Sequence, residues 1–539
     1  MSTPLRTDLA IVGSGFAGSL LALIARRLGL RVVLLERERH PRFAIGESST
    51  PLANLLLEEL AKCYELPELL PFVKWGTWNR QRPEVACGLK RGFTFYHHQF
   101  GQTWSANPAR SSELLVAASP RDEIADTHWF RADVDHAFAK LAVQRGAELF
   151  ERTLPQSILW HADGAEIQAR TVTNDLAIRC RFIIDASGPR GFLARALPLP
   201  EKGFAPMPKT QALFSHFHGV QRWDALHPSG APPPYPVDDA ALHHVFDGGW
   251  IWILRFNNGV TSAGVAATDD LFSRLDLAEG RPGWERLLEQ LPSVREQFRA
   301  AEPCLPFRHL PRLTFRTSTV AAENWALTPS AAGFVDPLLS TGFPLTLLGV
   351  QRLARLLERD WGSERWRSGL AGYEAATLTE LDRTAALIGS LYRNMNDFET
   401  FANLSLLYFA AASFSETARR LDRPSLADGF LLHQNPVFNP AFLRCIEMAT
   451  PPASLLARRT FAGEIAQAIE AVNVAGFGDR SRRNHYPARA EDLLAACGKF
   501  GVDETAIRKM LERSGFSTSE NLRPSSALRC HSACDSLDL

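Results

Sequence analysis

Gly13, Gly15 and Gly18 form a G-x-G-x-x-G pattern directly after the apolar run 9–12. The first glycine permits a tight turn, the second lets backbone N–H groups approach a phosphate, and the third lets a helix pack closely on a strand. Glu36 ends a second apolar run, where an acid can accept hydrogen bonds from a ribose. The spacing therefore predicts a dinucleotide site with its phosphates at a helix N-terminus.

These residues require a strand, a helix and a second strand to position them. The run 9–12 is typical of a buried parallel strand, the leucines between 20 and 28 share one helical face, and 31–35 predicts the second strand. A lone glycine pattern is weak evidence, and a βαβ turn without a ligand is the alternative. Because strand, helix, strand and acid occur in order, we expect a Rossmann-type unit here.

A lysine and an anion-friendly turn are further candidates for chemistry. Lys90 begins an alternating, aromatic-rich segment, so it is either an exposed strand residue, the commoner case, or a desolvated amine available for catalysis. Thr341 and Gly342 precede a helix predicted from about 345, where free N–H groups would attract an anion. Upstream of Lys90, the loop 45–51 precedes a helix over 52–60 that Ser49 or Thr50 could cap.

Composition limits the classes of function. The 539 residues are 45% hydrophobic, and Lys plus Arg equal Asp plus Glu at 59 each, so we expect a large core, two to four folding units and no overall field that attracts nucleic acid or a membrane. No leader and no apolar run of membrane-spanning length are evident, which predicts a cytoplasmic protein. The eight cysteines are scattered, so we expect reduced thiols and no metal site.

Taken together, the motifs resemble the flavin-dependent halogenase family, the tryptophan-halogenase-like branch of the FAD-dependent monooxygenase superfamily. The matching segments are Gly13 to Gly18, Glu36, Gly46-Glu47-Ser48, Arg131, Asp185 to Gly188, and Phe334 to Gly342. The resemblance implies an oxidoreductase and flavoprotein with a set of FAD-binding residues: Gly13, Gly15, Phe16, Ala17, Gly18, Glu36, Arg37, Glu47, Ser48, Arg131, Asp185, Gly188, Asp336 and Gly342.

The resemblance also implies an activity. In the family, reduced FAD from a separate flavin reductase and oxygen convert chloride or bromide to hypohalous acid, which reaches a lysine beside an aromatic substrate. Lys90 matches that catalytic lysine, and the backbone of Thr341 and Gly342 matches the halide site. The implied function is halogenation of an aromatic or phenolic small molecule.

Three departures from the family pattern keep an alternative open. The family's W-x-W-x-I-P box keeps Trp250 and Trp252 but has Leu254-Arg255 in place of Ile-Pro, Leu339 replaces the glutamate that orients indole in tryptophan halogenases, and Pro329-Ser330 replaces a Gly-Asp. Tryptophan is therefore a poor substrate guess. The alternatives are a non-halogenating FAD-dependent monooxygenase or dehydrogenase on the same scaffold and, less favoured, a flavin-bound protein that only binds a ligand.

The expected fold class is α/β: a Rossmann-type FAD-binding domain with an interleaved β-rich substrate domain and a helical C-terminal region. The predicted discontinuous domains are 1–75, 126–200 and 301–360 for FAD, 76–125 and 201–300 for the substrate region, 361–513 for the helical region, and 514–539 for a disordered tail.

Overall fold

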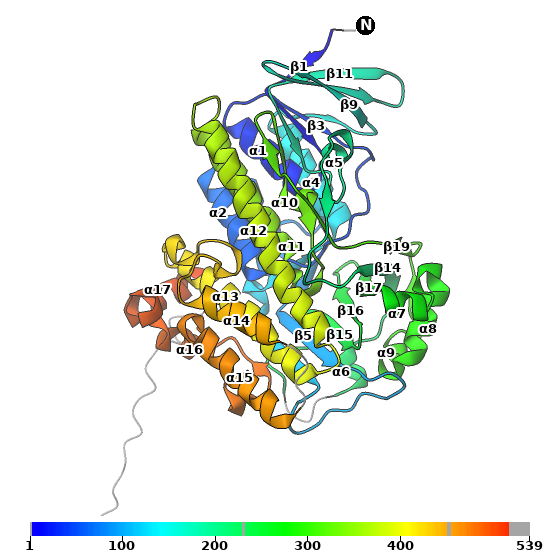
Figure 1. Ribbon diagram of the computed structural model, residues 1–539, viewed down its shortest axis with the longest axis vertical. Coiled ribbons are helices and arrows are strands. Elements are labelled where there is room, and N and C mark those ends of the chain that lie inside the picture. The colour runs from blue at the N-terminus through cyan, green and yellow to red at the C-terminus, as the bar shows by residue number, and fades with distance from the viewer. Residues whose placement is uncertain (1–2, 229–231, 450–453, 517–539) are drawn as a thin grey trace, which may run out of the picture.

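The N-terminal unit is built on a six-stranded sheet in the order β21-β22-β12-β2-β3-β8. The computed structural model describes residues 3–228, 232–449 and 454–516 (Figure 1). Neighbouring strands from β22 to β8 run parallel, and β21 is antiparallel. The strands are β2 (Leu9–Val12), β3 (Val32–Leu35), β8 (Glu148–Phe150), β12 (Phe182–Asp185), β21 (Ala321–Ala322) and β22 (Trp325–Leu327). The strand predicted over 9–12 is confirmed, and the second begins one residue later than expected.

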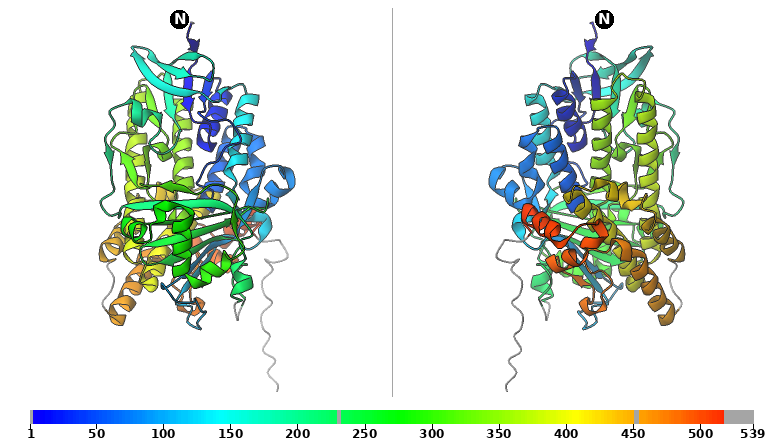
Figure 2. Two further views of the ribbon diagram at one scale, coloured as in Figure 1. Left: turned by 90° about the vertical axis from the view of Figure 1, so that its right-hand side faces the viewer. Right: turned by 90° about the vertical axis from the view of Figure 1, so that its left-hand side faces the viewer.

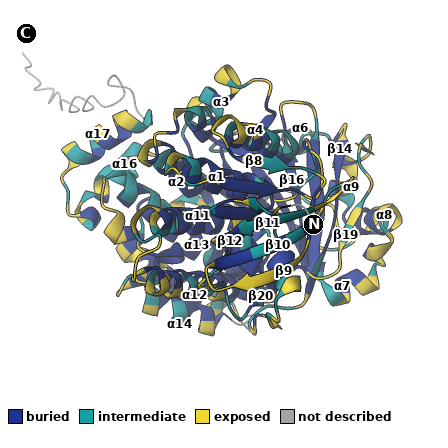
Figure 3. Ribbon diagram, turned by 90° about the horizontal axis from the view of Figure 1, so that it is seen from above, coloured by how far each residue is buried: buried dark blue, intermediate teal, exposed yellow. Residues whose placement is uncertain are grey.

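Three helices pack around the carboxyl end of this sheet: α1 (Phe16–Arg27), α4 (Arg131–Gln144) and α11 (Gly342–Arg359). Helix α1 is buried from Phe16 to Ala25, because it lies against both of the other helices. Gly18 permits this packing, since a Cβ there would collide with the carbonyl oxygen of Gly13. Figure 3 shows α1 mostly buried, whereas α4 also carries intermediate and exposed residues.

A nine-stranded sheet crosses the molecule below the N-terminal unit (Figure 2). Its order is β18-β14-β17-β16-β15-β5-β6-β24, with β19 also beside β14. The strands are β5 (Gly92–His97), β6 (Glu113–Ala117), β14 (Thr210–His218), β15 (Ala241–Phe246), β16 (Gly249–Arg255), β17 (Thr261–Thr268), β18 (Glu302–Pro303), β19 (Arg308–Leu310) and β24 (His485–Tyr486). The two faces of β16 enter different cores: Trp250, Trp252 and Leu254 join the main core, whereas Ile251 and Ile253 join a second one.

Helices dominate the chain after residue 360. Helix α12 runs from the N-terminal unit to the nine-stranded sheet, and α13 packs on both α2 and α15 (Figure 1). The C-terminal helices are α12 (Trp366–Arg393), α13 (Phe398–Arg420), α14 (Phe438–Met448), α15 (Leu455–Ile469), α16 (Ala490–Ala495) and α17 (Glu504–Ser514); α2 (Pro51–Cys63) belongs to the N-terminal part of the chain. Among the described residues, no helix is long and apolar enough to cross a membrane. The predicted fold class is confirmed.

Two further predictions concern the C-terminal tail and the domain boundaries. Of the tail predicted over 514–539, everything from 517 onward, with Cys530 and Cys534, lies outside the described residues. The nine-stranded sheet takes β18, β19 and β24 from beyond the two segments expected to form the substrate region. The domain boundaries themselves remain a prediction.

Candidate active site

Lys90 ends the short strand β4 (Cys87–Lys90), which forms a two-stranded sheet with β7 (Asp126–Trp129). Its side chain is completely buried, so the commoner alternative of an exposed strand lysine is wrong. The Nζ atom donates to the Ser49 carbonyl oxygen at 2.5 Å and to the Ser48 hydroxyl at 2.9 Å. A longer contact of 3.4 Å reaches the Ser340 hydroxyl. Lys90 therefore joins two segments far apart in sequence, the loop at 46–50 and the turn at 337–342.

Burial controls the charge of this amine. Removal from water lowers the pKa of Lys90 to about 7, and the nearby Asp126 carboxylate partly opposes that fall. The Nζ atom also lies 3.9 Å from the centre of the Phe93 ring, whose face attracts a cation. Lys90 is thus placed to change its charge near neutral pH, as an acid or base in catalysis requires.

The turn before α11 has unusual backbone geometry. Leu339 and Ser340 have φ values of 63° and 55°, a left-handed conformation that non-glycine residues rarely adopt. Neither the N–H of Thr341 nor that of Gly342 donates to a group among the described residues, and a Cβ on Gly342 would have no atom within 4 Å. Successive free N–H groups at a helix start form an anion-binding concavity. Thr341 and Gly342 therefore fit their predicted role.

The glycine loop faces a cluster of charged side chains. A Cβ on Gly15 would lie 3.4 Å from the Arg131 guanidinium, 3.5 Å from the Arg42 guanidinium and 3.5 Å from the Asp135 carboxylate. Arg131 and Arg42 both pair with the Asp135 carboxylate, at 2.8 and 3.1 Å. The Phe16 N–H at the start of α1 also donates to Asp135. Two arginines at a helix N-terminus are suited to a pyrophosphate.

Glu36 lies at the end of β3, as predicted, and is buried. Its carboxylate accepts hydrogen bonds from the Ser14 N–H and hydroxyl and forms a 3.1 Å ion pair with Arg42. Although burial opposes it, this ion pair helps to hold the pKa of Glu36 below its usual value. Arg37, by contrast, is exposed and contacts Glu38. The structure thus places Glu36 beside the glycine loop and Arg37 at the surface.

Two predicted acids, Asp185 and Asp336, accept hydrogen bonds from protein groups. Asp185 accepts from the N–H groups of Ser187 and Leu193, and the turn that it holds packs its Ala186 backbone against Gly13. Asp336 accepts from the Leu338 N–H, the Trp250 indole and the Tyr392 hydroxyl. These carboxylates shape the backbone around the predicted cofactor site. Direct contact with FAD remains a prediction for both.

The other predicted cofactor residues surround the same region. Ala17 and Phe16 are buried in the first turn of α1, and Phe16 stacks on Phe343 of α11 at 4.9 Å. The Glu47 carboxylate forms a hydrogen bond of 3.0 Å with the His216 imidazole, and the Ser48 hydroxyl accepts a hydrogen bond from Lys90. A Cβ on Gly188 would meet no atom within 4 Å, so space remains beside it.

The altered tryptophan box has a structural explanation. The ring centres of Trp250 and Trp252 are 5.8 Å apart, and Leu254 extends their apolar face. Arg255, which replaces the proline, alternates to the opposite side and pairs with the buried Asp238 at 3.0 Å. The substitution therefore leaves the face that carries the tryptophans apolar.

Sequence reasoning missed Arg42, Asp135, Asn54 and Asp126. The spacing of Arg131 and Asp135 at i and i+4 on a helix could have indicated their ion pair. Thr50 was one of two candidate helix caps and is confirmed: its hydroxyl accepts from the Ala53 N–H at the start of α2.

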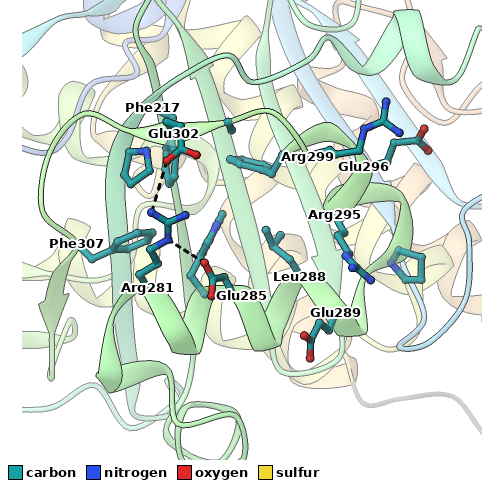
Figure 4. Close-up of a pocket in the computed structure, with 15 residues that line it drawn as sticks. Phe217, Arg281, Glu285, Leu288, Glu289, Arg295, Glu296, Arg299, Glu302 and Phe307 are labelled. Atoms are coloured by element: carbon teal, nitrogen blue, oxygen red, sulfur yellow. Dashed lines mark hydrogen bonds and ion pairs between the residues drawn. The ribbon is translucent and has the colours of Figure 1, made fainter.

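A groove of about 600 Å³ opens elsewhere, beside α8 (Arg281–Gln290) and α9 (Pro292–Gln297) (Figure 4). Charges of both signs line it, with Arg281 paired to both Glu285 and Glu302 over an aromatic floor that includes Phe307. None of the residues predicted for the active site borders it.

Three features together point to a flavin-dependent oxidoreductase: a Rossmann-type sheet, a glycine loop faced by two arginines, and a buried amine held between the loop at 46–50 and the turn at 337–342. The profile of the FAD dependent oxidoreductase family matches residues 8–316, and the chain belongs to that family. Its cofactor is FAD, and the chain is an enzyme.

Similar proteins narrow the class. Monodechloroaminopyrrolnitrin halogenase PrnC of Pseudomonas fluorescens is 28% identical over 402 residues, which cover 72% of this chain and 68% of the relative. Tetracycline 7-halogenase of Kitasatospora aureofaciens is 29% identical over 373 residues, covering 67% and 65%. The chain thus spans about two thirds of each relative's length. The resemblance to flavin-dependent halogenases is confirmed.

A solved structure shares the fold over most of the chain. The halogenase PltM, in complex with phloroglucinol and FAD, superposes with a TM-score of 0.78 at 24% identity, covering 88% of this chain and 99% of PltM. A structure of the flavin-dependent brominase Bmp2 gives a TM-score of 0.58 at 19% identity, covering 86% of this chain and 98% of Bmp2.

Proposed function

We propose that this enzyme halogenates an aromatic or phenolic small molecule, with chloride or bromide as the halogen source. The observation that carries the proposal is the position of Lys90, which is buried between the loop at 46–50 and the turn at 337–342. The names of the relatives support it, since they are halogenases and one acts on tetracycline. PltM was crystallised with a phenol, phloroglucinol.

The charged cluster around Gly15 fits FAD. Arg42 and Arg131 would hold its pyrophosphate, and Glu36 would accept from its ribose. When bound in reduced form, FAD together with oxygen would supply the oxidising equivalents that convert halide to hypohalous acid. A separate flavin reductase is the proposed source of reduced FAD.

Lys90 would then act on the hypohalous acid. An ammonium group that donates a hydrogen bond to its oxygen makes the halogen more electrophilic and stabilises the hydroxide that leaves as water. The low polarity around Lys90 strengthens this interaction. The substrate ring gains the halogen and loses a proton.

A product survey tests this function. Incubation with reduced FAD, oxygen, bromide and a panel of phenols and indoles should give brominated phenols, seen in mass spectra as a gain of bromine with loss of hydrogen. A product that has gained an oxygen atom and no bromine would instead identify a monooxygenase, the alternative that the changed tryptophan box favours.

A halide is expected at the Ser340-Thr341-Gly342 turn. The N–H groups of Thr341 and Gly342, which have no acceptor within the part of the chain that the structure describes, can hold an anion without a formal positive charge. Crystals soaked in bromide should show anomalous density within hydrogen-bond distance of these two nitrogens. Crystals soaked in a non-anomalous anion serve as the control. An empty turn at high bromide concentration would leave it as a structural element only.

A further inference from the structure

Lys90 and Asp126 occupy paired positions on β4 and β7. Side chains at paired positions of antiparallel strands project to the same face. Lys90 is completely buried and Asp126 is only 7% exposed, so each has lost nearly all of its solvation. An isolated buried charge is costly, and a buried charge of opposite sign is its usual compensation.

Ser49, through both its backbone carbonyl and its hydroxyl, and the Asn54 side chain connect the pair by hydrogen bonds. The Lys90 Nζ donates to the carbonyl oxygen of Ser49, and the Ser49 hydroxyl donates to Asn54 Oδ1 at 2.6 Å. The Asn54 amide nitrogen then donates to Asp126 Oδ1 at 3.0 Å. Because an amide donor favours the carboxylate form, Asn54 stabilises a negative charge on Asp126. The other oxygen, Oδ2, has no hydrogen-bond partner among the described residues.

Other charged and titratable groups face this pair from neighbouring elements. Burial raises the pKa of Asp126 to about 7, and Glu416 of α13 adds to that rise, whereas Lys90, Arg420 of α13 and the Asn54 hydrogen bond lower it. Tyr408 of the same helix has its pKa raised by burial and by Asp126. His128 and His243 face Lys90, and burial lowers the pKa of both rings, so they stay neutral at pH 7. Asp126 is therefore the carboxylate that acts most directly on Lys90.

We propose that Asp126 is a positioning residue that keeps Lys90 in its ammonium form, connected to it through Ser49 and Asn54. This inference rests on the proposed function, since the ammonium form is the one that donates a hydrogen bond to hypohalous acid. Asp126 itself contacts neither FAD nor substrate in this proposal. The negative charge that Asp126 carries when it is ionised extends the pH range over which Lys90 stays protonated.

The charge of Lys90 can be measured without any turnover. The chain has eight lysines, so protein labelled with ¹³C-lysine and loaded with oxidised FAD gives a small set of Cε resonances. Lys90→Met identifies the Lys90 resonance. In Asp126→Asn the pKa of Lys90 should fall by roughly one unit, because a neighbouring anion has been removed. Asp126→Glu, which keeps the carboxylate, should leave the pKa of Lys90 close to its wild-type value.

Asn54→Ala provides a second, independent variant. It removes the amide that favours ionised Asp126, so the pKa of Lys90 should again fall, though less than in Asp126→Asn. Near-ultraviolet circular dichroism checks that each variant is folded. If the Lys90 resonance of a folded Asp126→Asn protein titrates at the wild-type pH, the proposal is overturned.

The pH profile of halogenation provides the functional measurement. In Asp126→Asn the alkaline limb of the profile should move to lower pH by about the same roughly one unit, while oxidation of reduced FAD by oxygen continues. A merely structural role would lower the rate equally at every pH, which contradicts the proposal. A wild-type protein that forms no halogenated product would defeat the proposed function but leave the titration result standing.

Discussion

Replacing Lys90 with methionine is expected to lower the yield of halogenated product by about 100-fold or more, the usual contribution of a positioned acid or base. Methionine is unbranched and nearly as long as lysine, so it fills the buried site without the charge. The hydrogen bonds from Nζ to Ser48 and Ser49 are lost with it. Oxygen should still oxidise reduced FAD at a near wild-type rate, because the predicted cofactor contacts lie on other residues.

Two measurements make this expectation specific. Product is quantified by mass spectrometry, and flavin oxidation is followed by absorbance in the same reaction. Lys62→Met is the matched control, since Lys62 lies on the surface of α2 and pairs with Glu58 one turn away on the same helix. Halogenation by Lys90→Met at a rate near that of Lys62→Met would remove Lys90 from the mechanism.

The sequence predicted the strands and glycine turn of the N-terminal unit because those signals are local. Gly18 packs on the Gly13 carbonyl, and the two apolar runs pair as β2 and β3, so these contacts lie within one βαβ unit. Burial of Lys90 could not be predicted in this way. Its alternating segment is typical of a half-exposed strand. In the structure, β4 forms a two-stranded sheet with β7, and the amine contacts residues 48, 49 and 340, which are distant in sequence.

The charged cluster shows the same limit. Glu36 was predicted from its place after a strand, and the structure confirms that place beside Ser14. Arg42 carries no recognisable signal, because it lies in an irregular loop and meets Asp135 across 93 residues of chain. Such a cluster follows from tertiary contacts, which a single sequence does not reveal.

Replacing Gly15 with valine is expected to weaken FAD binding by on the order of 10- to 100-fold, equivalent to about 1–3 kcal/mol of overpacking. Gly15 suits this test better than the other two glycines of the motif. Its φ of −65° is open to any residue, whereas Gly13 has a φ of 97° and Gly18 packs against the Gly13 carbonyl. The valine methyl groups would enter the space beside Arg131 and Arg42, where the pyrophosphate is expected.

The bound flavin is measured by absorbance after purification and by titration of the apoprotein with FAD. Gly372→Val is the matched control: Gly372 lies in α12, and a Cβ there would meet no atom within 4 Å, so this variant carries the same change in residue type without entering the site. Thermal unfolding of the FAD-free proteins separates lost affinity from lost folding. Because the backbone at Gly15 is unstrained, a folded Gly15→Val protein that retains full FAD would show that the phosphates lie away from this loop.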